Sequence, residues 1–597
     1  AAAALYGARA MNGVIVITTK KGKIGKPVIS YSGNFSTQQK PSYRNFNIMN
    51  SAQQLSVLGE LERKGYLNTD ILSKADYGIY GKYYNLVNGD DKGDFGVINS
   101  PEAKKDFLLR YGNANTDWFD ILFKQNLIQE HSLSVSFGTD KSQSYFSTSF
   151  LNDNGWTIAD KVKRYTLNFR NNYQVSDRLS FGFSTLASVR NQQVPGSLER
   201  RSNPVEGKFD RDFDINPFSY ALNTSRTMTA YDQQGDLEYF RMNFAPFNII
   251  SELENNKIQL NMADIRLQGE LSFKLSKHIT YDFLGVMRYV QTGREHRITE
   301  HANMANAYRA ADNATIADAN KYLYRDPDDP DANPVIVLPS GGFYNRNEDL
   351  MKFYNVRNNL RYNQTFKDIH QVNVLVGQEI KYTDRQNSNN TGYGFQYDQG
   401  GTPFVDYRIL KQTIEANFPY YGMREYYNRF AAFYGSAGYT LNDKYNFTAY
   451  LRYDGSNGFG KSTVARWLPT YTVAGSWNLD REAFMKKLDW ISMARIRASY
   501  GLSGDTGPAT NSAVLFQSII TRRPFADEKE SAIQLKSLEN TELTWEKLKS
   551  ANLGIDLSML ANRISLSADV YERNSFDLID EIRTSDSGGE IYQVENY

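Results

Sequence analysis

Hydrophobic and polar residues alternate one by one along many stretches of this 597-residue chain. Residues 265–275 show the pattern most clearly, with Ile, Leu, Gly or Phe at every odd position and a charged or polar residue at every even one. Segments 179–189, 445–453, 494–500 and 564–571 repeat it. Successive side chains of a β-strand point to opposite faces, so each segment is predicted to be a strand with one apolar face and one polar face.

About fifteen segments carry enough of this pattern to be predicted as strands. They are residues 28–40, 127–138, 144–153, 163–175, 179–192, 263–275, 279–297, 350–366, 371–385, 425–440, 445–454, 466–479, 492–501, 544–560 and 563–579. Short polar turns such as Leu441–Lys444 join alternate pairs, and the other connections are mostly long. The long ones are residues 41–126, 193–262, 298–349, 386–424 and 502–543.

Short turns at one end and long loops at the other are typical of an outer-membrane β-barrel. About 9–11 tilted residues cross a bilayer, which the predicted strands reach or exceed. Fifteen is an odd number, and an open sheet edge cannot face lipid, so we expect further strands beyond Tyr597. The predicted fold is therefore all-β: a large transmembrane antiparallel β-barrel of about 22 strands when complete, a size that requires an internal plug.

Aromatic residues make up 14% of the chain, and several lie near the predicted strand ends, where they would form girdles at the membrane interfaces. The predicted girdle residues are Tyr145, Phe150, Tyr165, Tyr173, Phe283, Tyr289, Tyr450 and Trp477. On the polar strand face, Arg266, Glu270, Arg495 and Arg497 are predicted to line a wet lumen.

Composition excludes several other classes of protein. The chain has no cysteine, so it has neither disulfides nor Cys-ligated metal sites. Its 68 basic and 67 acidic residues balance, so no basic field indicates nucleic-acid binding. The five histidines form no HExxH pattern, and no G-x-S-x-G elbow is present. We therefore predict that the protein is not an enzyme.

The N-terminal sequence carries a family signature. Residues 5–22 read LYGARAMNGVIVITTKKG and resemble the end of the plug domain of SusC/RagA-like TonB-dependent transporters. Shorter segments resemble family motifs in the same order: Thr116–Trp118, Arg452–Ser456, Ser499–Gly501 and Leu543–Lys547. The resemblance divides the chain into the C-terminal end of a plug domain, residues 1–25, and an incomplete TonB-dependent receptor β-barrel, residues 26–597.

The resemblance also implies a function. Family members import oligomeric nutrients, glycans or peptides, across the outer membrane of Gram-negative, Bacteroidota-type bacteria. They are surrounded by outer-membrane lipid, work under a SusD-like surface lipoprotein that acts as a lid, and draw energy from the TonB–ExbB–ExbD complex. Two transporter–lid pairs are expected to form a dimer. A passive porin, or a surface adhesin or glycan-binding β protein without transport activity, remains an alternative interpretation of the alternation alone.

Candidate binding residues lie in the long loops. Tyr220, Tyr231 and Tyr344 are candidates for stacking on sugar rings, and Arg226 is a candidate for pairing with a peptide carboxylate. For each residue taken singly, a side chain that is solvated or packs against the lid is the favoured interpretation. Residues 51–64 look like a short helix suited to contact with a lid. No resident cofactor is predicted. Residues 326–331 hold four carboxylates and leave calcium open, in the loops or in the lid partner, but they lack the spacing of a calcium loop, so a solvated loop is favoured. We assign no metal site.

Overall fold

The computed structural model describes residues 20–67, 78–88, 96–196, 201–203, 208–210, 213, 215–326, 329, 331–415, 417, 420–460, 462–505, 514–522, 529–583, 585 and 592–597. Its main feature is a 16-stranded sheet, in which fifteen strands follow one antiparallel path and the short β14 (Thr402–Pro403) pairs only with the end of β13. Each of the fifteen predicted strands overlaps one strand of this path, so the predicted meander is confirmed.

The fifteen strands follow one another in chain order across the sheet. They are β1 (Gly25–Gln38), β2 (Asn126–Gly138), β3 (Ser142–Asp153), β4 (Lys161–Gln174), β5 (Leu179–Pro195), β10 (Asn256–Lys274), β11 (Ile279–Ile298), β12 (Gly342–Phe366), β13 (His370–Gln396), β15 (Tyr421–Leu441), β16 (Tyr445–Ser456), β17 (Trp467–Asn478), β18 (Ile491–Asp505), β21 (Glu546–Met559) and β22 (Ile564–Phe576). Four small hairpins lie in the long connections or after β22. They are β6–β7 (Arg201–Asn203, Lys208–Asp210), β8–β9 (Phe240–Met242, Ala245–Phe247), β19–β20 (Leu515–Arg522, Lys529–Ser537) and β23–β24 (Ile579–Arg583, Tyr592–Asn596).

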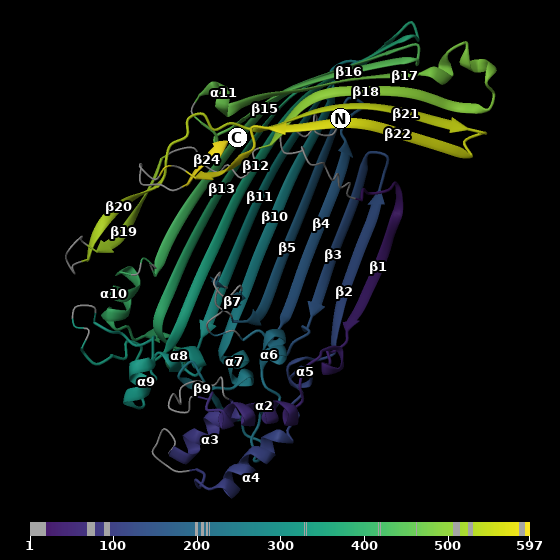
Figure 1. The fold of residues 1–597 in the computed structure, drawn as a ribbon. Helices are drawn as coiled ribbons and strands as arrows, with labels where there is room; N and C mark the ends of the chain where they lie inside the picture. The colour runs from purple at the N-terminus through teal and green to yellow at the C-terminus, as the bar shows by residue number, and fades with distance from the viewer. Residues whose placement is uncertain are drawn as a thin grey trace.

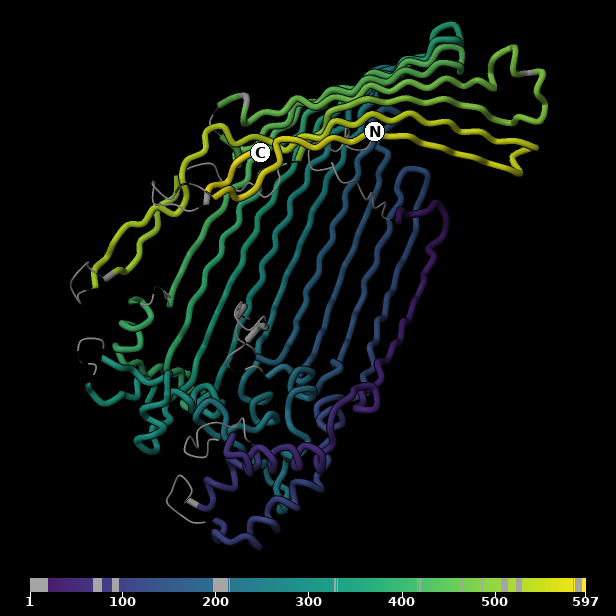
Figure 2. Tube along the Cα trace, viewed as in Figure 1, coloured from purple at the N-terminus to yellow at the C-terminus, as the bar shows by residue number. Residues whose placement is uncertain are grey.

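The sheet forms a curved, open wall. In Figures 1 and 2 the strands from β1 to β13 lie side by side, and the later strands, β16 to β22, cross over at the top of the view. In the described part of the chain, β1 pairs only with β2, and β22 only with β21. The short turns gather at one end of the strands and the helices of the long connections at the other, which we call the short-turn end and the long-loop end.

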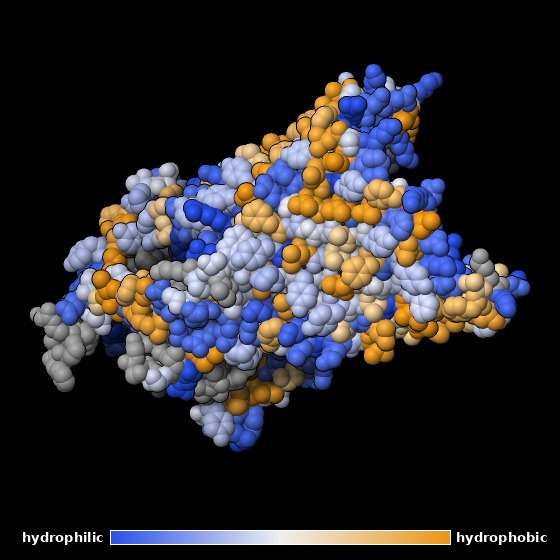
Figure 3. Space-filling view, turned by 90° about the horizontal axis from the view of Figure 1, so that it is seen from above, coloured by the Kyte–Doolittle hydropathy of each residue, from blue (hydrophilic) through white to orange (hydrophobic). Residues whose placement is uncertain are grey.

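The register gives the sheet two unlike faces. Ile265 pairs with Tyr289 and Leu267 with Met287 on one face, where Leu267 is 40% and Met287 46% exposed. Residues of the opposite face are polar at the same level, as in the pair formed by Arg266 and Arg288. Hydrophobic side chains accordingly reach the surface of the molecule, where they appear orange in Figure 3.

The polar face is the inner one. Ile258, Ile298 and Phe343 lie on the same face as Arg266, by the two-residue period of their strands, and all three are buried. Ile298 and Phe343 belong to a core that also contains residues of the loop between β11 and β12. The long connections therefore fold over the polar face, and the apolar face is the outer face of the wall.

The predicted aromatic girdle is wrong at two positions. Tyr145 pairs with Ser136, and Tyr450 with Ser436, so both lie on the inner face. Phe150, Tyr165, Phe283 and Tyr289 lie on the outer face, as predicted. The two misplaced tyrosines are one residue out of step with their outward neighbours, and a shift of one residue moves a strand side chain to the opposite face.

Helices occur mainly at the long-loop end (Figure 1). They are α2 (Ser51–Arg63), α3 (Ile79–Asn88), α4 (Pro101–Gly112), α5 (Trp118–Leu122), α6 (Pro217–Asn223), α7 (Ile249–Asn255), α8 (Asn303–Ala307), α9 (Ala314–Ala319), α10 (Tyr407–Glu415) and α11 (Thr463–Arg466). The predicted helix at 51–64 is confirmed as α2, which begins with a reciprocal capping box between Asn50 and Gln53. Among the described residues, no helix is both long and apolar enough to cross a membrane.

Two predictions fall largely outside the described residues. The plug signature at residues 5–22 is described only from Lys20 onward, so the division into residues 1–25 and 26–597 stays a prediction. The acidic segment 326–331 is described only at Asp326, Asp329 and Asp331. In the described part of the chain, no group of three or more His, Asp or Glu side chains is placed to hold a metal ion.

Candidate functional site: the loop modules and the inner wall

The loops between β1 and β2 and between β5 and β10 form one helical module. Their shared core contains Trp118, Phe119 and Leu122 of α5 together with Phe247 and Ile249. Side-chain hydrogen bonds join the two loops: the Ser51 hydroxyl donates to the Arg226 carbonyl at 2.6 Å, and the Thr116 hydroxyl to the Met228 carbonyl at 2.5 Å. We call this unit the first loop module.

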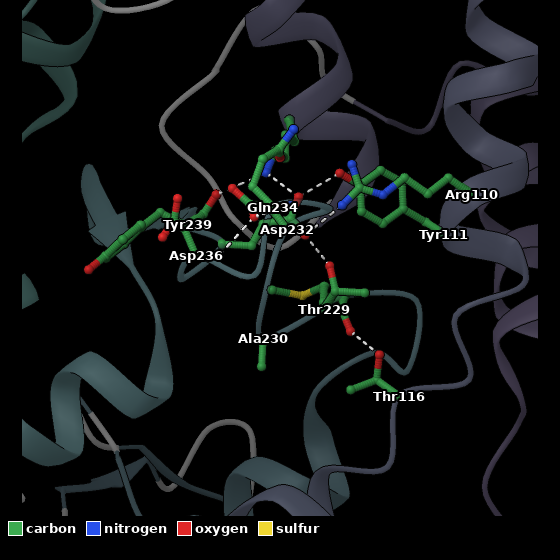
Figure 4. A network of polar contacts seen from close by, with 12 residues as sticks. Arg110, Tyr111, Thr116, Thr229, Ala230, Asp232, Gln234, Asp236 and Tyr239 are labelled. Atoms are coloured by element: carbon green, nitrogen blue, oxygen red, sulfur yellow. Dashed lines mark hydrogen bonds and ion pairs between the residues drawn. The ribbon is translucent and has the colours of Figure 1, made fainter.

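A buried carboxylate, that of Glu238, ties this module together; its partners Arg110, Tyr111 and Thr229 are labelled in Figure 4. Glu238, of which only 4% is exposed, accepts hydrogen bonds from Lys82 at 2.5 Å, Tyr111 at 2.7 Å and Arg110 at 3.3 Å, and from Thr229. Burial opposes the charge of Glu238, but the hydrogen bonds from Lys82, Thr229 and Tyr111 outweigh it and hold the pKa of Glu238 below its usual range. Helices α3 and α4 are thereby fixed to the loop that precedes β8.

A second buried carboxylate joins the first module to the loop between β11 and β12. Glu252 in α7 is 3% exposed and accepts a 2.5 Å hydrogen bond from the backbone N–H of Asn303, at the start of α8. The Asn303 side-chain amide donates back to the carbonyls of Met242, Ala245 and Pro246. Burial raises the pKa of Glu252 to about 7. This junction is therefore sensitive to protonation near neutral pH.

The Glu252 junction is expected to weaken as the pH rises. The folded pKa of about 7 exceeds the ordinary value of 4.5, so its stabilisation is complete below about pH 4.5 and is lost as pH rises through 7. The full loss is about 3 kcal/mol, at 1.36 kcal/mol per pKa unit. Hydrogen exchange of the α8 amides, corrected for intrinsic rates, should be faster at about pH 8 than at about pH 5. Glu252→Gln should remove the difference; equal protection at both pH values in the unaltered protein would contradict the assignment.

A third cluster lies where β16, β21 and the hairpin β23–β24 meet on the inner wall. Trp545 is fully buried, its ring centroid lies 4.5 Å from that of Phe459, and its indole N–H donates to the Arg466 carbonyl at 3.2 Å. Nearby, Arg452 is 1% exposed and lies 2.7 Å from the Asp454 carboxylate and 3.5 Å from that of Glu379. The cluster anchors the connections that follow β16 and β18.

The sequence interpretation of this region missed the ion pair. The residue types of Asp454–Gly458 (DGSNG) are typical of a tight turn, whereas Asp454 lies inside β16 and is completely buried. The signal was the spacing of Arg452 and Asp454, which places both on the same face of a strand. The strand predicted for 563–579 is likewise interrupted at Asp577, whose φ of 56° turns the chain into β23.

The structure places two of the four predicted binding residues inside the first loop module. Tyr220 is 8% exposed, packs edge-on against Trp118 at 5.1 Å and borders a cavity of about 380 Å³. The Arg226 guanidinium donates to the carbonyls of Thr116 at 3.1 Å and Asn115 at 3.2 Å. It also lies 4.5 Å from the ring of Tyr43.

The other two predicted residues lie apart from this module core. Tyr231 is 48% exposed at the start of a loop that Asp232 stabilises by accepting from the backbone N–H groups of Gln234 and Asp236. Tyr344 is on the outer face of β12, opposite Arg297, and stacks on Phe395 at 5.2 Å. The four residues do not converge on one site, and their part in substrate binding stays a prediction.

The inner wall carries a polar cavity of about 640 Å³ that spans β4, β5, β10, β11 and β12. Its lining includes Arg266, Glu270 and Arg357. Farther along the wall, Arg497 pairs with Asp556 and Asp569, both at 2.9 Å. Arg495 donates to Asn478 at 3.0 Å. The four charged residues predicted on the polar strand face therefore all lie on the inner wall.

An antiparallel wall with an apolar outer face, a polar inner face and folded loops at one end defines the architecture of a membrane β-barrel. The family model for the TonB-dependent receptor-like β-barrel matches residues 280–597, more than half of the chain. The chain belongs to this family. The chain is also similar to TonB-dependent receptor SusC and to the RagAB transporter structure, which confirms the resemblance inferred from the sequence.

Three relatives illustrate the similarity. TonB-dependent receptor SusC of Bacteroides thetaiotaomicron is 24% identical over 98% of this chain and 50% of its own length. A TonB-dependent receptor of Formosa agariphila is 22% identical over 100% of this chain and 50% of its own. Among solved structures, the RagAB peptide transporter matches with a TM-score of 0.70 at 19% identity, over 99% of this chain and 59% of that chain. The chain thus spans about half the length of these relatives.

Proposed function

We propose that the full-length protein is an outer-membrane active transporter that imports oligomeric nutrients. The observation that carries this proposal is the two-faced wall: an apolar outer face suits lipid, and a polar inner face beneath folded loops suits a hydrated oligomer in transit. Membership of the TonB-dependent receptor family supports energy supply by TonB–ExbB–ExbD. The proposed activity is transport without catalysis.

The proposed partner is a SusD-like surface lipoprotein, seated on the first loop module and the other loops at the long-loop end. Similarity to SusC and to the RagAB transporter supports this partner and a Gram-negative, Bacteroidota-type outer membrane. We further propose a dimer of transporter–lid pairs. Tyr231 is the predicted binding residue with the most exposed ring, so it is the first proposed contact for a sugar or peptide; Tyr220, Tyr344 and Arg226 are proposed to act within or beside the loops.

Purification of the full-length protein from native membranes in detergent tests the function. Mass spectrometry of the co-purifying proteins, and chemical analysis of any released oligomer, should find a SusD-like lipoprotein and a bound glycan or peptide. A detergent-stable barrel without a lid would favour a passive porin or a receptor that works alone. A protein that stays in solution without detergent would contradict the membrane assignment and favour an adhesin or glycan-binding protein.

A further inference from the structure

Four arginines lie on one band of the inner wall, directly beneath the loops. They are Arg190, Arg294, Arg385 and Arg424, which we call the arginine belt. The strand register places them at similar heights along the strands. One row of paired residues runs from Arg190 through Met262 to Thr292, and then across β12 and β13 to Arg424. Arg294 lies two residues from this row on β11, and Arg385 two residues from it on β13.

The belt lies where an oligomer would first meet the wall. Two and four residues beyond Arg294 on the same face, His296 is 3% exposed and Ile298 is fully buried beneath the loops. All four arginines themselves are exposed. From β5 to β15 the belt crosses five strand spacings, roughly 24 Å at about 4.8 Å per spacing. That span matches about seven residues of an extended peptide.

The belt differs in its charge balance from four other arginines of the inner wall. Arg164, Arg288, Arg361 and Arg497 each have a carboxylate within salt-bridge distance. None of the four belt residues forms an ion pair with a described residue. Arg190 donates to the neutral side chain of Gln192 at 2.6 Å. In the row itself, the carboxylate of Asp349 accepts from the Asn387 amide at 2.8 Å.

The positive charge is concentrated at a cost to stability. Arg190 lies directly opposite Arg164 on the neighbouring strand, and like charges in that position destabilise a sheet. The Glu130 carboxylate lies 3.2 Å from the Arg164 guanidinium and offsets its charge. This ion pair does not offset the charge of Arg190. Farther from the loops, Arg266 extends the positive charge along the same face and donates to the neutral Gln268.

We infer that the arginine belt selects anionic oligomers, so the imported nutrient carries repeated carboxylate or sulfate groups. Guanidinium groups bind such oxyanions through two parallel hydrogen bonds, and a row of them matches a repeated charge better than a single site. A cleft lined by one sign of charge also concentrates ligands of the opposite sign. Uronate-containing glycans, sulfated glycans and Asp- or Glu-rich peptides share this chemistry. The inference rests on the proposed transport function and names its substrate class.

Binding of defined probes to the full-length protein, with its lid partner, tests the inference. Hexagalacturonate and hexaglutamate represent the anionic glycan and peptide; maltohexaose and hexaserine are their neutral counterparts. The unaltered protein should bind one anionic probe about tenfold or more tighter than its neutral counterpart, and added salt should weaken that binding. Which anionic probe binds distinguishes glycan from peptide.

Variants of the belt arginines test whether the belt causes the preference for anionic probes. Arg294→Gln, Arg385→Gln and Arg424→Gln combined should weaken anionic binding at least about tenfold and leave neutral binding unchanged. A matched triple variant on the outer face, Arg297→Gln, Arg346→Gln and Arg429→Gln, should leave both unchanged. Resistance of each folded barrel to SDS confirms folding. Equal binding of anionic and neutral probes, or unchanged anionic binding in the belt variant, would overturn the inference.

The outcomes separate the belt from the transport function. Uptake of a neutral oligomer that is insensitive to the belt variant would overturn the inference and leave the proposed transporter intact. Absence of binding and uptake for every probe, and of any co-purifying oligomer, would count against both.

Discussion

Replacing Arg452 by methionine is expected to lower the free energy of unfolding by about 3–5 kcal/mol. The Arg452 side chain is 1% exposed, and its guanidinium lies 2.7 Å from the carboxylate of Asp454, which is completely buried. Methionine fills much of the volume but leaves the Asp454 carboxylate without this cation in a low-dielectric wall. Glu379 is less affected because Lys381 stays 3.0 Å away. Urea unfolding of the full-length protein in detergent measures the change.

A double variant separates lost charge from lost packing. Arg452→Met combined with Asp454→Leu should recover most of the stability, because replacing both members of a buried ion pair by apolar residues is often nearly neutral. Arg266→Met is the matched single control, since Arg266 is exposed on the same inner face. The assignment of a stabilising role to the buried Arg452–Asp454 ion pair would be contradicted by either of two results. One is a double variant as unstable as Arg452→Met; the other is an Arg452→Met variant within about 1 kcal/mol of the parent.

Replacing Trp545 by alanine is the second large effect, with an expected loss of about 3–5 kcal/mol. Its indole is fully buried against Phe459 and donates to the Arg466 carbonyl, so the change leaves a cavity and removes this hydrogen bond. The hairpin β23–β24 is expected to lose protection, since Asn596 reaches the backbone of Thr544 next to Trp545. Hydrogen exchange of residues 592–597 measures this local release.

Trp490 is the matched control for Trp545. It is 49% exposed at the short-turn end, so Trp490→Ala should change the free energy of unfolding by less than about 0.5 kcal/mol. Equal losses of unfolding free energy in the two variants, or unchanged exchange protection of residues 592–597 in Trp545→Ala, would show that Trp545 does not anchor the hairpin β23–β24.

Strand number and order were predictable because lipid and lumen impose opposite demands on alternate residues. Strand ends were not. Residues 371–385 were predicted for β13, which continues through Gln396 over 27 residues. Its last eleven residues, QNSNNTGYGFQ, show no clear alternation. Beyond the apolar band both faces of a strand meet water, so the period of two disappears while backbone pairing continues.

The site was less predictable than the fold. Tyr220 and Tyr231 look alike in the sequence as loop tyrosines, yet one is 8% and the other 48% exposed, because contacts with α5 from a distant loop bury Tyr220. The arginine belt was also missed. Its members lie on four strands far apart in the chain, and only the register places them in one band.

The apolar strand face is expected to meet lipid, and the polar face is not. Because this chain contains no cysteine, single cysteines labelled with a fluorophore test it in the full-length protein reconstituted with spin-labelled lipid. Probes at Leu267→Cys and Val376→Cys, on the outer face, should be strongly quenched. Probes at Gln268→Cys and Asn355→Cys, beside the inner-wall cavity, should keep their fluorescence. Quenching at the inner positions, or none at the outer ones, would contradict the assignment of the apolar face to lipid and of the polar face to the lumen.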